Sequence, residues 1–228
     1  MSDQRQRALE RAAEAGDREA EAELLRERVR AGVLARERVE LLAALGDEAA
    51  RQALDDPPAL LPPGELGVLA NGLAEFGKEQ LVRAAIAAAI PLLEVIEEHA
   101  SYEKRPRAAL DAVEAWLVRP DEARRVGARL AAVEADRAGE QLMDEPQPTL
   151  SHVELSFFAW AMSGVGDLAA EQRPEALGTC AAGVFAELQS LYHSLGDERG
   201  VDGRVRRALS AWCRDEEPPA QPLEEGVA

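Results

Sequence analysis

The segment Leu81–Ile96 reads LVRAAIAAAIPLLEVI and decides the fold class of this chain. Its apolar residues recur at helical spacing in two stripes, one of Val82, Ile86, Ile90 and Leu93 and the other of Leu81, Ala85, Ala88 and Leu92. So broad an apolar surface is typical of a helix buried on most sides, so we expect the helix over 78–99 to lie at the centre of a bundle. Pro91 is expected to kink it, because an interior proline removes a hydrogen bond and clashes with the preceding turn.

The segments on either side also carry helical rather than strand patterns. Gly16-Asp17 and Gly46-Asp47 each place a helix-ending glycine before an aspartate suited to cap the next helix. The helix predicted over 120–141 is amphipathic through Val126, Leu130 and Val133. No segment alternates with the period of a strand. We therefore predict an all-α protein, a multi-helical bundle or short α-solenoid of HEAT/TPR-like helical hairpins, with about ten or eleven helices.

Composition along the chain predicts three parts. Residues 1–54 should form N-terminal helical hairpins with nearly balanced charge. The segment Asp55–Gly64 contains four prolines and is the best candidate for a boundary. Residues 65–215 should form the main α-helical domain, and residues 216–228, rich in acids and prolines, a disordered acidic tail.

The overall charge limits the classes of partner. The 228 residues carry a formal net charge of −17, which argues against a nucleic-acid binder. The charged amino terminus lacks the apolar core of a signal peptide, and Leu81–Ile96 is too short and too interrupted to span a bilayer. These features predict a cytoplasmic location away from membranes.

The sequence lacks the spacings that most cofactor and catalytic chemistries require. There is no glycine-rich phosphate loop, no Glu-x-x-His pattern and no Gly-x-Ser-x-Gly elbow. Cys180 and Cys213 belong to no Cys-x-x-Cys pair, so we interpret them as ordinary buried thiols. We therefore expect no metal, no cofactor and no catalytic residue.

The stretch from Leu92 to Trp116 carries a family resemblance. It runs from a helix through an acidic loop into Arg105-Pro106-Arg107-Ala-Ala-Leu-Asp-Ala-Val-Glu-Ala-Trp116. Over about residues 78–140 it resembles the immunity proteins of bacterial polymorphic-toxin systems, in which a helix with an Arg-Pro-Arg start and a late tryptophan follows an acidic loop. The resemblance implies a non-enzymatic inhibitor that neutralises a cognate toxin.

The resemblance and the charge together give a candidate binding surface made of Glu94, Glu97, Glu98 and Glu103. Such acids would attract a basic toxin and speed its association. The simpler interpretation is that these glutamates are the solvated side and end of a helix. Two other functions stay open, a helical-repeat adaptor that binds another protein and an enzyme with a site dispersed in the bundle. The sequence does not determine the oligomeric state.

Overall fold

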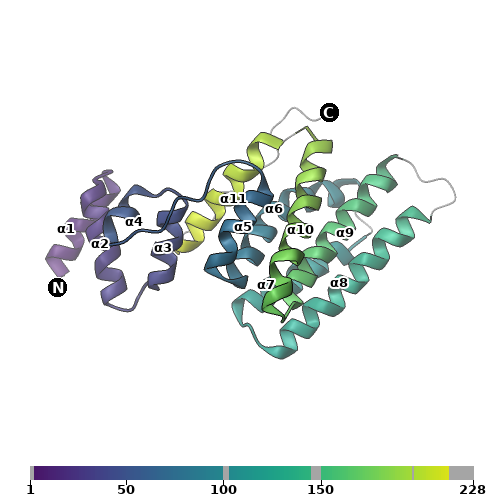
Figure 1. Cartoon of the computed structure of the whole chain (residues 1–228), viewed down its shortest axis with the longest axis horizontal. Coiled ribbons are helices and arrows are strands. Elements are labelled where there is room, and N and C mark those ends of the chain that lie inside the picture. Colours follow the sequence, from purple (N-terminus) through teal and green to yellow (C-terminus); the bar gives the residue numbers. More distant parts are fainter. Residues whose placement is uncertain (1–2, 100–102, 145–149, 197, 216–228) are drawn as a thin grey trace. The chain divides into compact units, whose positions relative to one another are not determined.

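The structure is a computed structural model that describes residues 3–99, 103–144, 150–196 and 198–215 (Figure 1). Over these residues the chain forms eleven α-helices, one short 3-10 turn and no strand. The predicted all-α class is confirmed. The predicted acidic tail, 216–228, lies outside the described residues.

The chain divides into two compact units. Unit 1 comprises the residues up to Pro62 together with the described residues from Leu209 onward, and unit 2 comprises Pro63–Ala208. The division therefore falls inside the proline-rich segment Asp55–Gly64. It also places Leu209 and the residues after it with the N-terminal helices, whereas we expected the main domain to extend to residue 215.

Unit 1 is built on four helices: α1 (Asp3–Glu14), α2 (Arg18–Arg30), α3 (Arg36–Ala44) and α4 (Glu48–Ala53). Both predicted Gly-Asp junctions occur. Gly16 and Gly46 have positive φ angles of 86° and 101°, a backbone region that glycine enters without a steric penalty. The carboxylates of Asp17 and Asp47 accept hydrogen bonds from the first free amides of α2 and α4.

The last described residues, from Leu209 onward, contribute to the core of unit 1. α11 (Glu198–Cys213) continues into this unit with Leu209, Ala211 and Cys213, all of them buried. Arg214 pairs with Glu21 at 3.2 Å and with Asp47. These contacts join residues separated by more than 160 positions in the sequence.

Unit 2 contains the remaining helices, with α9 at its centre. They are α5 (Leu66–Leu73), the 3-10 turn (Ala74–Phe76), α6 (Lys78–His99), α7 (Arg105–Val118), α8 (Glu122–Met143), α9 (Leu150–Ala170), α10 (Pro174–Ser194) and the first part of α11. α9 packs against α6, α7, α8 and α10. α6 is buried through both predicted stripes except at Ile90, which is partly exposed, and the helix continues through Pro91.

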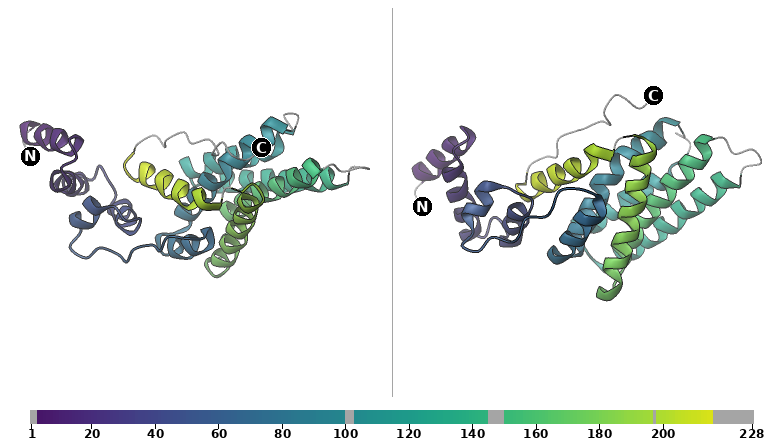
Figure 2. Two further views of the ribbon diagram at one scale, coloured as in Figure 1. Left: turned by 90° about the horizontal axis from the view of Figure 1, so that it is seen from above. Right: turned by 45° about the horizontal axis from the view of Figure 1, so that its top comes forward.

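The closest packing in unit 2 is between α8 and α9, which run side by side (Figure 2). α8 meets its neighbours through small residues, Ala128, Ala132, Ala135, Ala138 and Gly139. On the facing helix, a Cβ built on Gly166 would stand only 2.7 Å from the Cβ of Ala132. The two backbones therefore approach closely, which only alanine and glycine allow.

This packing corrects the interpretation of α8. The amphipathic face predicted from Val126, Leu130 and Val133 does not enter the core, since all three side chains are exposed. The smaller residues are buried instead, because α9 approaches too closely to leave room for valine or leucine.

Candidate functional site

The four glutamates predicted as a binding surface lie at the end of α6 and the start of α7, in two different environments. Glu97 receives two hydrogen bonds from Arg107, from Nε at 3.0 Å and from Nη2 at 2.8 Å. This pairing lowers the pKa of Glu97 and ties the last turns of α6 to the first turn of α7. Glu94 and Glu98, on the same helix, are exposed.

Glu103 is enclosed rather than exposed. Its residue is only 9% exposed, and its carboxylate accepts hydrogen bonds from the backbone N–H of Arg105 at 2.9 Å and from the guanidinium of Arg105 at 2.8 and 2.5 Å. Arg105 also donates to Gln141 of α8 at 2.9 Å. These bonds lower the pKa of Glu103, and they make it part of the start of α7 instead of a charge open to a partner.

The Glu103→Gln variant is expected to lose about 1–2 kcal/mol of unfolding free energy at pH 7, because it leaves the Arg105 guanidinium without its counter-ion. Since the folded-state pKa of Glu103 lies below its ordinary value of 4.5, the stabilisation is complete at neutral pH and is lost as the pH falls from 4.5 through the folded pKa. Urea unfolding of both proteins at a series of pH values should show the gap closing in acid. An equal gap at pH 7 and pH 3 would contradict this assignment, and Glu98→Gln is the control.

Two further carboxylates, beyond the four glutamates that the sequence pattern indicated, are exposed on α7. These residues, Asp111 and Glu114, lie away from the buried Ala109 and Val113 of this helix, and their charges add to the hydrogen bond of Glu97 in raising the pKa of Arg107. No residue in the described part of the chain forms an ion pair with Glu94, Glu98, Asp111 or Glu114. We call these four residues the α6–α7 acidic surface. The exposed side of α7 could have been inferred from its helical period.

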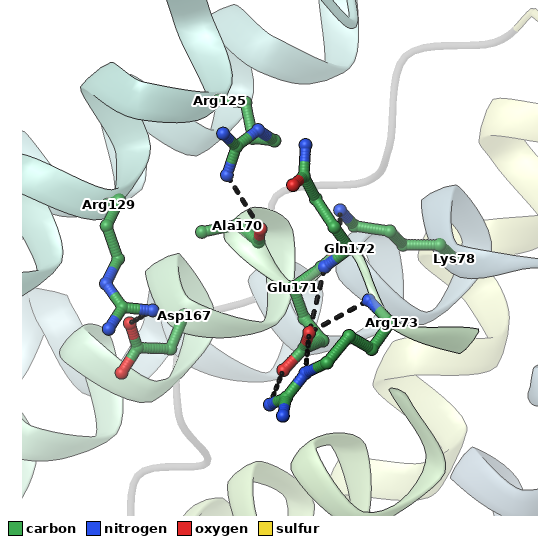
Figure 3. A network of polar contacts seen from close by, with 8 residues as sticks. All are labelled: Lys78, Arg125, Arg129, Asp167, Ala170, Glu171, Gln172 and Arg173. Atoms are coloured by element: carbon green, nitrogen blue, oxygen red, sulfur yellow. Dashed lines mark hydrogen bonds and ion pairs between the residues drawn. The ribbon is translucent and has the colours of Figure 1, made fainter. Parts of the chain in front are cut away.

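A second polar cluster closes the C-terminus of α9 (Figure 3). Lys78 Nζ donates to the carbonyl oxygen of Glu171 at 2.6 Å, and Arg125 Nη1 donates to that of Ala170 at 3.2 Å. Both cations therefore satisfy carbonyl groups that the helix leaves without a partner, at the end where its dipole favours positive charge.

The carboxylates of this second cluster are also engaged by arginines. Glu171 accepts hydrogen bonds from Nε and Nη2 of Arg173 at 3.1 and 3.0 Å and from the backbone N–H groups of Gln172 and Arg173, which lowers its pKa to about 2. Burial raises the pKa of Asp167, which lies 3.4 Å from Arg129. A general base needs a pKa near the working pH, so Glu171 is suited to ending α9 and not to proton transfer.

The two cysteines and two of the tryptophans pack against other parts of the protein. Cys213 is buried and Cys180 half-buried, and burial raises the pKa of the Cys180 thiol, which keeps it protonated at neutral pH. Trp116 is buried with Lys78 Nζ 4.7 Å from its ring centroid, and the guanidinium of Arg38 lies 4.3 Å from the ring centroid of Trp212.

Among the described residues, no three His, Cys, Asp or Glu side chains gather closely enough to hold a metal ion.

Comparison with family models, curated proteins and solved structures finds no match to this chain. The resemblance to immunity proteins therefore stays a prediction. Within the described residues, none of the helices combines the length and the apolar character needed to cross a membrane.

Proposed function

We propose that this chain is a non-enzymatic inhibitor that binds a basic protein, such as a bacterial toxin, through the α6–α7 acidic surface. The observation that carries the proposal is the group of four exposed carboxylates, Glu94, Glu98, Asp111 and Glu114, on two helices that the Glu97–Arg107 ion pair holds together. A surface fixed in this way loses little conformational freedom on binding.

The charge favours a basic partner over other protein partners. A carboxylate that forms no ion pair within the chain is open to a lysine or arginine from another molecule. The net charge of −17 adds a long-range attraction, which can raise the association rate of a basic protein by 10 to 10³ at low salt. Because exposed charges are screened, the binding should weaken as salt rises.

The resemblance to immunity proteins is the reason for proposing a toxin as the basic partner. Arg105 and Arg107 bind Glu103 and Glu97, while Pro106 and Trp116 are buried. The two arginines and Pro106 thus build the junction of α6 and α7, whereas Trp116 packs against Lys78 at the other end of α6. The sequence lacks the spacings that most catalytic chemistries require, which favours an inhibitor over an enzyme.

Affinity capture with the full chain as bait tests the proposal. The wild-type chain should retain a basic protein from a lysate of the source organism at about 50 mM salt and release most of it at about 500 mM. The double variant Glu94→Lys with Glu98→Lys should bind the purified partner roughly tenfold more slowly. Lysine near the end of α6 is compatible with the helix dipole, so the variant is expected to fold.

The control variant combines Asp55→Lys with Asp56→Lys, which makes the same change of net charge on an exposed loop of unit 1. It should bind almost as well as the wild-type chain. A partner that is not basic, or one bound equally by both double variants, would contradict the inhibitor mechanism and favour the adaptor alternative. Co-expression of the captured protein with this chain should then show whether its toxicity is suppressed.

A further inference from the structure

The outward face of α8 has the composition of a contact surface. Leu130 is 63% exposed, Val126 40% and Val133 37%, while the alanines of the same helix are buried. These three positions follow one another at helical spacing, so they form a single apolar stripe. Figure 1 shows α8 along the edge of unit 2, with α9 on its inner side.

Two ion pairs flank this stripe at equal distances. Glu122 binds Arg125 at 2.8 Å before it, and Glu134 binds Arg137 after it. Glu122 lies four residues before Val126, and Arg137 lies four residues after Val133. In each pair the acid precedes the arginine in the sequence. The outermost charge before the stripe is therefore the acid Glu122, and the outermost charge after it is the base Arg137.

This order is self-complementary when two copies of the helix meet antiparallel. Aligning the centre of the stripe with itself places Val126 opposite Val133 of the second copy, with Leu130 near the two-fold axis. The same register places the exposed Glu122 opposite the exposed Arg137, whereas Arg125, which falls opposite Glu134, is held by the carbonyl oxygen of Ala170. Two-fold symmetry repeats the contact between Glu122 and Arg137.

The charge around α8 also differs from that of the whole chain. Residues 119–144 contain five arginines and six acids, a nearly balanced set in a chain of net charge −17. The arginines are Arg119, Arg124, Arg125, Arg129 and Arg137, and the acids are Asp121, Glu122, Glu134, Asp136, Glu140 and Asp144. Two copies of an acidic chain repel each other least where the local charge is balanced.

We propose that α8 is a self-association surface, on which a second copy of this chain binds antiparallel through Val126, Leu130 and Val133. A contact along one helix buries less than the roughly 1,200 Å² of a standard interface, so the dimer is weak and depends on concentration. Its residues are distinct from those of the α6–α7 acidic surface, and it does not rest on the proposed function.

Sedimentation equilibrium of the full chain between about 10 μM and 1 mM tests the association. The mass of the wild-type protein should rise from 24.6 kDa toward twice that value. Leu130→Ser should abolish the rise, because it removes the largest apolar side chain of the stripe, next to the two-fold axis. Val33→Ser is the matched control, since Val33 is 71% exposed but lies in unit 1, and it should dimerise as the wild type does.

A mixing experiment tests the antiparallel register. Glu122→Arg alone sets two arginines against each other in its own dimer, and Arg137→Glu alone sets two glutamates against each other. Each variant should dissociate with a constant about tenfold above the wild-type value, since both symmetric contacts change from attraction to repulsion. An equimolar mixture should regain the wild-type association, because every contact across a mixed dimer is again between opposite charges.

Three outcomes would overturn the proposal. A wild-type chain that stays at its monomer mass at 1 mM excludes self-association, and an unchanged dimer in Leu130→Ser places the contact elsewhere. A mixture of the two charge variants no more associated than either alone excludes the antiparallel register. Circular dichroism of each variant shows whether it keeps the helical fold.

Discussion

The Gly166→Leu variant is expected to lose roughly 3 kcal/mol of unfolding free energy. A Cβ on Gly166 of α9 would stand 2.7 Å from the Cβ of Ala132 and 3.2 Å from the carbonyl oxygen of Ala128, both on α8. Neither neighbour can turn away, because one is a methyl group fixed on its helix and the other is backbone. A larger side chain must therefore push the two helices apart. Urea unfolding followed by circular dichroism measures the loss.

Gly127→Leu is the matched control for this substitution. Gly127 lies on α8, and a Cβ built on it meets nothing within 4 Å. Leucine forms helix better than glycine, so the control should match or exceed the wild-type stability by up to about 1 kcal/mol. Equal stabilities of Gly166→Leu and Gly127→Leu would show that α8 and α9 do not pack this closely.

A chain that ends at Ala208 is expected to lose the ordered core of unit 1. It lacks the buried residues Leu209, Ala211 and Cys213 and the ion pairs that Arg214 makes with α2 and with the cap of α4. Loss of the leucine and its neighbours alone should remove about 3 kcal/mol or more. Hydrogen exchange read by mass spectrometry should show the amides of α2, α3 and α4 exchanging much faster.

The control for the truncation is a chain that ends at Asp215, which keeps every described contact of α11 and of Arg214. Leu209→Asp in the full chain gives an independent measurement, because it places a charge in the same core without shortening the chain. Slow exchange of α2–α4 in the chain ending at Ala208 would mean that residues 1–62 fold without the C-terminal segment.

Local sequence signals predicted the helices of this protein well. Gly16-Asp17 and Gly46-Asp47 marked helix junctions, because positive φ and side-chain capping are properties of single residues and their immediate neighbours. The stripes of Leu81–Ile96 predicted a buried helix, since burial on most sides requires apolar residues on most sides.

The candidate surface could be predicted only in part. Four glutamates near one another suggested a uniform acidic cluster, but Glu97 and Glu103 are engaged by Arg107 and Arg105. Whether an arginine reaches back to an acid depends on the turn between two helices, which residue types do not specify. Asp111 and Glu114 join the surface because α7 turns the side opposite to its buried residues toward solvent.

The sequence by itself determined that the chain is helical, that helices meet at Gly16-Asp17 and Gly46-Asp47, and that a proline-rich segment separates two parts. Only the tertiary structure decided which face of α8 is buried, because Val126, Leu130 and Val133 match the pattern of a core face as well as the alanines do. The close approach of α9 at Gly166 selects the small residues. Only the tertiary structure, likewise, assigned Leu209 and Arg214 to the N-terminal unit, since contacts between distant positions depend on how helices pack and not on local propensity.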